Sequence, residues 1–313
     1  MPCLDDWVSA GELLNRLDQT AVAFASLKVY LVDDGSTSRP SSAFMNARYQ
    51  NMHVEVVRLE TNLGHQRALC IGLVQSLRDP DTTHFVLMDS DGEDNPDDIP
   101  TLIATLLDSE ADAVAATRKK RYVGSTFKTL NRAFQGLFRI LTGRTLNFGN
   151  FMALTNGAAH RLANTPDAWN NVPATLMRSR VRIDRVPLDR GKRFDGQSRL
   201  GLTALVNHGL GAVAVYSDVV FTRIILACSA ALGASVLVGI AALITRILTG
   251  SPLPGWFALG TTAVAVGSLV LLVLVTSLTF IMLSNRRTIS PPLPAMVDPY
   301  IASSTSLPVN RGD

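Results

Sequence analysis

Residues 84–98 read HFVLMDSDGEDNPDD, in which an unbroken apolar run is followed directly by an acidic segment. The run FVLM at 85–88 is typical of a strand that is buried on both faces of a parallel sheet. Side chains alternate along a strand, so Asp89 and Asp91 point the same way, about 7 Å apart. Two such carboxylates repel each other unless a cation lies between them, and oxygen ligands favour Mg²⁺ or Mn²⁺. The alternative interpretation is a solvated acidic turn before the next helix.

Polar clusters follow other expected strands in the same way. Strands are expected at 27–32, 54–59 and 113–116 as well as at 85–88, and helices at 8–18, 66–77 and 96–107. This alternation specifies an α/β fold with a parallel, doubly wound sheet, in which ligands bind beyond the carboxyl ends of the strands. The clusters VDDGS (32–36), NLG (62–64) and RKKR (118–121) all lie at such ends. We therefore expect one site assembled from several loops.

Two uncharged segments, 224–245 and 256–284, each exceed the roughly 20 apolar residues that span a bilayer. They predict a transmembrane hairpin joined by a short Pro/Gly turn. Basic residues flank the hairpin at Arg223, Arg286 and Arg287, whereas the connecting turn carries none. The positive-inside rule therefore places the N-terminal domain and the C-terminal tail in the cytoplasm. The expected location is a bacterial inner membrane, as a multi-pass protein.

Composition excludes some other classes of function. The 313 residues carry a net charge of only +3, and no aromatic-and-basic motif is present, so we expect no nucleic-acid partner. The three cysteines are scattered, which favours a reducing compartment. Asp5, Asp6 and Glu12 interrupt any apolar N-terminal segment, so no signal peptide is expected. The expected domains are a catalytic domain at 1–198, an amphipathic coupling segment at 199–222, the hairpin at 223–285 and a Pro/Ser-rich, disordered tail at 286–313.

The motifs VDDGS, NLG and DSD (89–91), in this order and spacing, resemble those of glycosyltransferase family 2 enzymes with the Rossmann-like GT-A fold. The two membrane segments make the chain similar to the branch that glycosylates polyprenyl or dolichyl phosphates. The resemblance covers roughly residues 1 to 285. It implies a nucleotide-sugar donor linked to UDP or GDP, a polyprenyl phosphate acceptor and a Mg²⁺ or Mn²⁺ cofactor. The sequence leaves open which sugar is used and whether the chain forms a homo-oligomer.

The resemblance also implies which residues hold the donor and the metal. The donor-binding set is Pro2, Asp6, Asp33, Asp34, Gly64 and Asp89. The metal set is Asp89, Asp91 and Glu93, and the catalytic set is Asp89, Asp91 and Arg199. Alternatives stay open for some of them: Asp33 and Asp34 are also common turn residues before a glycine, and Gly64 also suits a helix start. His65 we expect to be structural rather than catalytic.

A lipid phosphate needs cations to hold it but no general base, because it is already ionised. The predicted acceptor-phosphate residues are Arg118, Arg121, Arg132, Ser198 and Arg199. The last two belong to the segment 193–199, RFDGQSR, which resembles an Arg…Gly-x-Ser-Lys segment of the family with Arg199 in place of Lys. Apolar residues recur at helical spacing among the basic residues of 128–144, so this helix either lies in the lipid headgroup plane or packs on the sheet with a solvated basic face.

Two departures from the family pattern bear on function. The chain begins at Met1-Pro2, so the family's first strand is expected to be missing, through a misassigned start or a rearranged sheet. An Asp followed by Gly-Phe-Arg is replaced by NFGNFM at 147–152, which weakens the prediction for the acceptor more than for the donor. The Gln-x-x-Arg-Trp signature of processive synthases is absent, which argues against polymerisation. We expect an inverting transferase that moves one sugar; the alternatives are another membrane-lipid acceptor, such as a diacylglycerol, or an inactive membrane-anchored partner protein.

Overall fold

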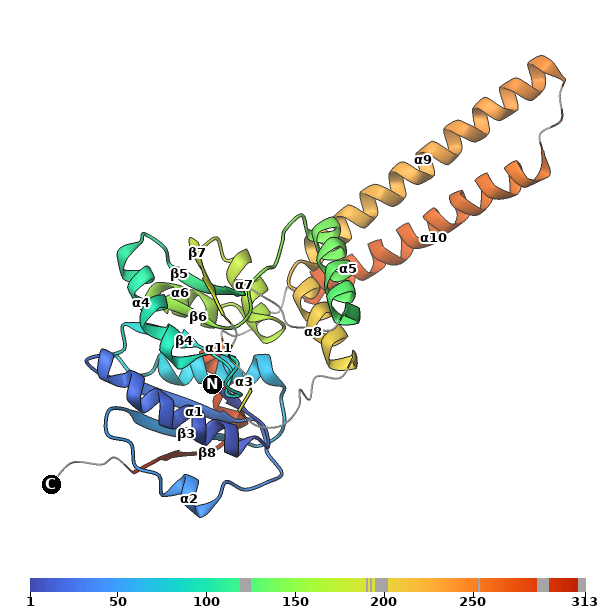
Figure 1. The fold of residues 1–313 in the computed structure, drawn as a ribbon. Helices are drawn as coiled ribbons and strands as arrows, with labels where there is room; N and C mark the ends of the chain where they lie inside the picture. The colour runs from blue at the N-terminus through green and yellow to red at the C-terminus, as the bar shows by residue number, and fades with distance from the viewer. Residues whose placement is uncertain are drawn as a thin grey trace. The chain divides into compact units, whose positions relative to one another are not determined.

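The computed structural model describes residues 1–118, 125–189, 191, 193–194, 202–250, 252, 254–285 and 293–308 (Figure 1). The chain divides into two compact units. The larger contains Met1–Gly136, Thr145–Val215 and Pro291–Asp313, and the smaller contains Leu137–Arg144 and Tyr216–Ser290. The larger unit is the α/β domain that the alternating pattern predicts, and the smaller contains the apolar hairpin.

The first sheet of the larger unit has the order β1-β2-β3-β8. Its strands are β1 (Pro2–Cys3), β2 (Lys28–Asp33), β3 (His53–Leu59) and β8 (Ile301–Ser306). The first three are parallel, and β8 lies antiparallel to β3. Where the family's first strand was expected to be missing, the chain forms a strand of only two residues, β1, which pair with Val32 and Asp33.

The second sheet has the order β4-β6-β5-β7. Its strands are β4 (His84–Leu87), β6 (Met152–Thr155), β5 (Ala113–Arg118) and β7 (Ile183–Leu188). Strand β6 is antiparallel to both of its neighbours, so the sheet is mixed rather than wholly parallel as predicted. The two-residue β1 is the end strand of the first sheet and β4 is the end strand of the second, so two sheets form in place of one. The hydroxyl of Ser90, just after β4, still donates to the Pro2 carbonyl over 2.6 Å.

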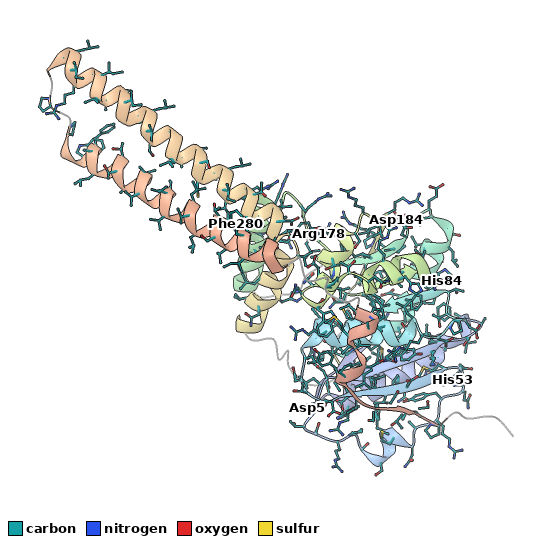
Figure 2. The ribbon with its side chains drawn as sticks, turned by 180° about the vertical axis from the view of Figure 1, so that it is seen from behind. Asp5, His53, His84, Arg178, Asp184 and Phe280 are labelled. Carbon is teal, nitrogen blue, oxygen red and sulfur yellow. The ribbon has the colours of Figure 1, made fainter. Side chains whose placement is uncertain are left out.

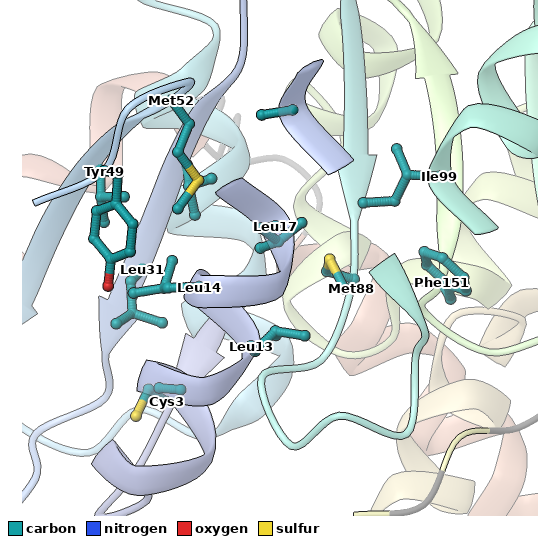
Figure 3. Packing of buried hydrophobic residues seen from close by; sticks show 14 of the residues in the cluster. Cys3, Leu13, Leu14, Leu17, Leu31, Tyr49, Met52, Met88, Ile99 and Phe151 are labelled. Carbon is teal, nitrogen blue, oxygen red and sulfur yellow. The ribbon is translucent and has the colours of Figure 1, made fainter. Parts of the chain in front are cut away.

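The larger unit also contains helices. They are α1 (Trp7–Thr20), α2 (Ser42–Met45), α3 (His65–Ser76), α4 (Ile99–Asp108), α6 (Asn156–Ala163), α7 (Val172–Arg178) and α8 (Leu202–Ala214), and α5 (Ser125–Thr142) passes from the larger unit into the smaller. The apolar face of α1 supplies Leu13, Leu14 and Leu17 to the core, each at most 2% exposed. Met88 and Phe151 belong to the same cluster, so the end of β4 is anchored in the core (Figure 3).

The smaller unit contains α9 (Ser217–Thr249) and α10 (Gly255–Asn285), which are long and apolar enough to cross a membrane, with mean hydropathies of 2.4 and 2.5. Their apolar side chains stand outward along both helices; Phe280, for example, is 70% exposed (Figure 2). The predicted spans fall within these helices, although α9 begins at Ser217, inside the expected coupling segment. At the base of the hairpin, Arg223 donates to the Ile140 carbonyl over 2.6 Å.

The predicted disorder of the tail at 286–313 is wrong for its described part, residues 293–308. The chain forms α11 (Leu293–Met296), a 3₁₀ turn at Asp298–Tyr300 and strand β8 on the edge of the first sheet. Leu293, Val297 and Leu307 are buried, at most 3% exposed. The Pro/Ser-rich composition suggested disorder. The three apolar residues are nevertheless buried in the folded domain, and β8 forms hydrogen bonds with the edge strand β3.

Candidate active site

The end of β2 is shaped by Asp34, whose carboxylate accepts hydrogen bonds from the backbone N–H groups of Leu63 (2.8 Å) and Gly64 (3.0 Å). These bonds fix the NLG loop beside β2. Gly35 has φ +72°, and a Cβ there would lie 2.6 Å from the Asn62 nitrogen, so the two loops approach too closely for a side chain. Burial raises the pKa of Asp34, and the two N–H donors offset part of that increase.

Asp33 and Asp5 arrange the loop that follows β2. One Asp33 oxygen accepts from the Ser36 N–H over 2.8 Å, and the other lies 3.7 Å from the Arg58 guanidinium. The Asp5 carboxylate accepts from the N–H (2.7 Å) and the hydroxyl (2.6 Å) of Ser38. Those hydrogen bonds lower the pKa of Asp5. Asp5 therefore joins the first loop of the chain to the loop after β2.

Two further predicted donor residues, Pro2 and Asp6, lie near the start of the chain. Pro2, in β1, is buried, and its carbonyl accepts the Ser90 hydroxyl, so its backbone links the ends of β1 and β4. Asp6 precedes α1, where its carbonyl accepts from the Ala10 N–H over 3.1 Å. The structure brings Pro2 to the ends of both sheets, and the roles of Pro2 and Asp6 toward a donor stay predictions.

The carboxylates after β4 face cationic or ionisable side chains. An Asp91 oxygen pairs with the Arg193 guanidinium, and both side chains are largely buried, at 14% and 21% exposed. The Nε2 atom of His65 lies 3.1 Å from an oxygen of Asp89. Removal from water lowers the pKa of His65, but the charge of Asp89 and its hydrogen bond raise it by more, so that pKa is above its usual value. Positive charge is therefore favoured at this strand end.

The described residues 191, 193 and 194 pack on the loop that carries Asp91. The N–H groups of Gly191 and Phe194 donate to the carbonyls of Glu93 (2.9 Å) and Asp91 (3.1 Å). Gly92 has φ +85°, and a Cβ there would lie 2.4 Å from the Phe194 ring. The glycine in the DSDGED run is thus required both by its backbone and by the ring beside it.

The residues present fit a hard divalent ion of the Mg²⁺ or Mn²⁺ type. Among the residues that the structure describes, no three His, Cys, Asp or Glu side chains are arranged to hold an ion, so Asp89, Asp91 and Glu93 are not gathered as a three-ligand set. Mg²⁺ commonly binds through only one or two carboxylates, together with water and substrate phosphates. Asp89 and Asp91 can supply those two, and the guanidinium beside Asp91 already marks a position for positive charge.

A solvent-open hollow adjoins Asp89 and Glu93. It lies at the carboxyl ends of β4, β5 and β7. Its polar lining includes Asp89, Glu93, Asp94, Asn150 and Asp189. Asp94 also accepts from the Asp89 N–H over 2.9 Å, which shapes the turn after β4. The position after each of these strands is where an α/β fold places its ligand.

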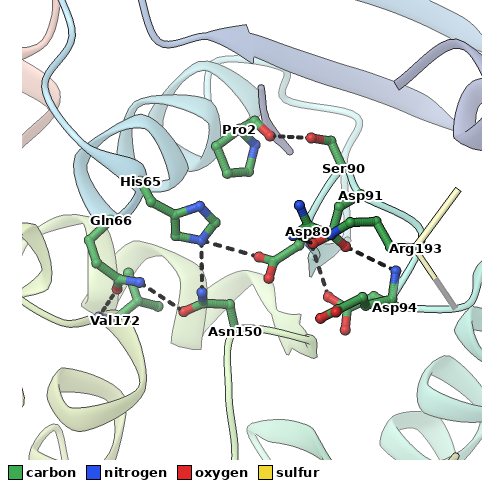
Figure 4. Close-up of polar contacts among 11 residues, drawn as sticks. Pro2, His65, Gln66, Asp89, Ser90, Asp91, Asp94, Asn150, Val172 and Arg193 are labelled. Atoms are coloured by element: carbon green, nitrogen blue, oxygen red, sulfur yellow. Dashed lines mark hydrogen bonds and ion pairs between the residues drawn. The ribbon is translucent and has the colours of Figure 1, made fainter. Parts of the chain in front are cut away.

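A hydrogen-bonded chain connects Asp89 to the start of α7 (Figure 4). Beyond its contact with Asp89, the His65 Nε2 atom lies 2.9 Å from the Asn150 amide nitrogen. The Asn150 oxygen accepts from the Gln66 amide over 3.2 Å, and the Gln66 oxygen accepts from the Val172 N–H over 2.7 Å. His65, expected to be structural, therefore contacts a predicted metal ligand. Gln66 and Asn150 were not identified from the sequence, because 84 residues separate them and no local motif marks them.

The predicted acceptor-phosphate residues are only partly described. Arg121, Ser198 and Arg199 lie outside the described residues. Arg118 ends β5, paired in register with Leu188, and Arg132 is an exposed residue of α5. The acceptor set therefore stays a prediction. Arg193, the first residue of the RFDGQSR segment, is described and contacts Asp91 instead.

The model of the family described as Glycosyl transferase family 2 matches residues 1–164, just over half of the chain. The matched region contains all three motifs and both strand ends described above. It stops before β7 and the hairpin.

Curated relatives are similar at low identity. The Bacillus subtilis glycosyltransferase YkoT is 22% identical over 252 residues, 79% of this chain and 73% of its own length. Dodecaprenyl-phosphate galacturonate synthase from Rhizobium johnstonii is 29% identical over 40% of this chain and 36% of its own length. Undecaprenyl-phosphate 4-deoxy-4-formamido-L-arabinose transferase from Proteus mirabilis is 27% identical over 47% and 44%. The chain thus spans less than half of the two relatives whose names give a substrate.

Solved structures agree with the fold. Glucosyl-3-phosphoglycerate synthase from Mycobacterium tuberculosis, crystallised with Mn²⁺, UDP-glucose and phosphoglyceric acid, superposes with a TM-score of 0.50 at 20% identity. The superposition covers 70% of this chain and 77% of that one. The predicted GT-A architecture is confirmed.

Proposed function

Since the chain belongs to glycosyl transferase family 2, we propose that it is a metal-dependent, inverting glycosyltransferase of the cytoplasmic membrane face. It moves one sugar from a nucleotide-diphosphate sugar to a polyprenyl phosphate. The names of the Rhizobium and Proteus relatives support a polyprenyl-phosphate acceptor. The two long apolar helices support a membrane-bound acceptor.

The observation that carries the proposal is that two strand ends, those of β2 and β4, differ in chemistry. At β2, the Asp34 carboxylate fixes the NLG loop through two backbone N–H groups, and this loop offers the surface for a base and ribose. At β4, Asp89 and Asp91 lie where positive charge is favoured, and Asp89 lines the hollow. We therefore place the nucleoside at the end of β2 and the sugar diphosphate at the end of β4.

The chain's own residues would bind and orient the reactants. Asp89 and Asp91 would hold a divalent ion, which when bound supplies Lewis-acid neutralisation of the departing diphosphate. Asp34 would hold the loop against which the nucleoside lies. An acceptor phosphate is itself the nucleophile, so the site needs cations to orient it and no side chain to remove a proton. Attack from the side opposite the diphosphate inverts the anomeric centre.

The direct test replaces Asp91 with Asn in the purified full chain, supplied with Mn²⁺, nucleotide sugars and undecaprenyl phosphate. Loss of one ligand carboxylate should lower glycolipid formation at least about 100-fold, or about 3 kcal/mol of transition-state stabilisation. Asp97→Asn is the matched control, because Asp97 is an exposed carboxylate a few residues farther on. Undiminished glycolipid formation by Asp91→Asn would refute the metal assignment.

A panel of acceptors separates the rival functions. Asn150, within the segment where relatives have Gly-Phe-Arg, lies in the hollow and is held by Gln66, so no cation stands at that position. If a diacylglycerol accepts sugar where undecaprenyl phosphate does not, the other-lipid alternative is correct. If no nucleotide sugar shifts the melting temperature, the inactive-partner alternative is correct.

A further inference from the structure

The described part of the tail, residues 293–308, lies beside the two elements that flank the NLG loop. Helix α11 contacts α3, which follows the loop (Figure 1). Leu293 and Val297, in and just after α11, are at most 1% exposed. Strand β8 pairs with β3, which precedes the loop. The tail therefore meets the chain on both sides of residues 60–64, the connection from β3 to α3.

Tyr300 contacts the first flank of this connection through its backbone. Its carbonyl accepts from the Glu60 N–H over 2.9 Å. The next residue, Ile301, pairs in register with Leu59, the last residue of β3. The bond to Tyr300 thus extends the pairing of the tail with β3 by one residue, to two positions before Asn62 of the NLG loop.

The Tyr300 ring contacts the second flank through Trp169. The centroids of the two rings lie 5.5 Å apart, at an interplanar angle of 60°. The Arg67 guanidinium lies 5.2 Å from the centroid of the Trp169 ring. Arg67 is the third residue of α3, and its N–H donates to the Gly64 carbonyl over 3.0 Å. The stack that begins at Tyr300 therefore ends at the last residue of the NLG loop.

The part of the loop between these flanks is open to a ligand. Asp34 accepts from two N–H groups in the second half of the loop. The first half, Thr61 and Asn62, is exposed. It lies along the chain between the Asp34 bonds and the Glu60–Tyr300 bond, so its position depends on both.

We propose that Tyr300 is a positioning residue for the nucleotide part of the donor. Through its carbonyl on Glu60 and its ring on Trp169, it holds the NLG loop where the nucleoside binds. The inference rests on the proposed function, because that function places the nucleoside at this loop. The tail lies outside residues 1–164, which the family model matches, so membership of the family does not imply this role.

A tail that only stabilises the fold would behave differently. Asp298 belongs to the same 3₁₀ turn as Tyr300, but it pairs with Arg78, just beyond the C-terminal end of α3. Loss of either side chain removes a contact of the tail, yet only Tyr300 lies beside the NLG loop. A purely stabilising tail therefore predicts the same result for both residues, a lower melting temperature with unchanged nucleotide affinity.

The test measures nucleotide binding by the purified full chain, well below the melting temperature of each variant. Tyr300→Ala removes the ring, Tyr300→Phe retains it, and Asp298→Asn is the matched control on the same turn. Isothermal titration calorimetry gives the Kd of UDP and of GDP at saturating Mn²⁺, and the Kd of Mn²⁺ alone. The transfer assay gives kcat and the donor KM.

We expect Tyr300→Ala to weaken binding of the nucleotide that the wild type binds by about 5- to 10-fold, because an aromatic pair and a cation–π contact together contribute roughly this factor. The donor KM should rise to the same extent. The values of kcat and of the Mn²⁺ affinity should stay within about twofold, since the β4 end keeps its contacts. Tyr300→Phe and Asp298→Asn should bind the nucleotide as the wild type does.

Unchanged nucleotide affinity in Tyr300→Ala, or an equal loss in Asp298→Asn, would overturn the inference. Should Tyr300→Ala fail to fold, Tyr300→Leu decides the question, because it removes the aromatic ring while keeping an apolar side chain of similar reach. A wild-type chain that binds neither UDP nor GDP with Mn²⁺ and transfers no sugar would instead overturn the proposed function together with the inference.

Discussion

The ends of β2 and β4 each carry two closely spaced aspartates, whose carboxylates differ in their main partners. At β2, Asp33 and Asp34 accept from backbone N–H groups, at 2.8 Å from Ser36 and at 2.8 and 3.0 Å from the NLG loop. At β4, Asp89 faces the His65 ring, and Asp91 pairs with the largely buried Arg193 guanidinium besides accepting from the Glu93 N–H over 2.9 Å. Asp33 also lies near a guanidinium, but that of Arg58 is 47% exposed and 3.7 Å away. The first pair builds the shape of a loop, and the second pair creates a place for positive charge.

A run of aspartates therefore does not by itself indicate a metal site. Backbone N–H donors satisfy a carboxylate without any further cation, and such an aspartate is then part of the architecture. Carboxylates whose partners are cationic side chains can exchange those partners for an ion. Removal of the arginine partner at each strand end in turn tests whether the two ends differ in this way.

The largest effect is expected from Arg193→Ala. The Asp91–Arg193 pair is largely buried, and removal of one partner of such a pair costs about 3 kcal/mol or more. Since the lost cation can be replaced by another, added Mn²⁺ should stabilise this variant more than the wild type. The measurement is thermal unfolding of the metal-free chain with and without Mn²⁺.

Arg58→Ala at the β2 end is the matched control for that experiment. Arg58 is 47% exposed and lies 3.7 Å from Asp33, so its loss should cost about 1 kcal/mol or less. Mn²⁺ should not distinguish this variant from the wild type, because Asp33 keeps its bond from the Ser36 N–H. An equal rescue by Mn²⁺ at both positions would abolish the distinction between the two strand ends.

A smaller loss is expected from Leu293→Ala in the tail. The tail covers the first sheet, which carries the β2 end, and Leu293 is 1% exposed. Truncation of a buried leucine costs about 2–3 kcal/mol. Leu107→Ala serves as the control, because Leu107 is 63% exposed and should give almost no change. Equal melting temperatures for wild type and Leu293→Ala would restore the prediction of a disordered tail.

Gly35→Ala should act on the β2 end alone, at about 1–3 kcal/mol. The glycine has φ +72°, and a Cβ there would lie 2.6 Å from the Asn62 nitrogen, so the NLG loop must move. The donor KM should rise, while the Mn²⁺ affinity of the β4 end is retained. Gly157→Ala in α6 is the opposite control, because a Cβ there meets nothing within 4 Å and should be neutral or slightly stabilising.

Much of this arrangement could be predicted from local patterns. Strand runs followed directly by aspartates placed Asp34, Asp89 and Asp91 at strand ends, and periodicity alone set the α/β class. Which carboxylate faces a backbone N–H and which faces a cation could not be predicted in this way. That outcome depends on the approach of the NLG loop to β2 and of Arg193 to Asp91, which are tertiary contacts.

The failures have physical causes of the same kind. Composition suggested a disordered tail, but Leu293 and Val297 are buried by a surface that only the folded domain creates. The expectation that His65 is structural stays a prediction, but the sequence did not indicate which residues surround it. Its partners Asn150 and Asp89 come from separate strand ends, so only the fold reveals that it faces the candidate metal site.

The smallest expected effect is the alkylation of two buried cysteines on elements next to the β2 end. Cys3 pairs in register with Asp33, and Cys70 lies on α3 behind the NLG loop. Burial raises the pKa of each to about 12, so roughly one thiol in 10,000 is ionised at pH 8. We expect negligible alkylation of either by iodoacetamide in the native chain and full alkylation in guanidinium, as measured by peptide mass spectrometry.

Rapid alkylation of Cys3 with Cys70 protected would mean that the β1–β2 pairing opens while α3 stays folded. The β2 end could then not be the fixed surface that contrasts with β4.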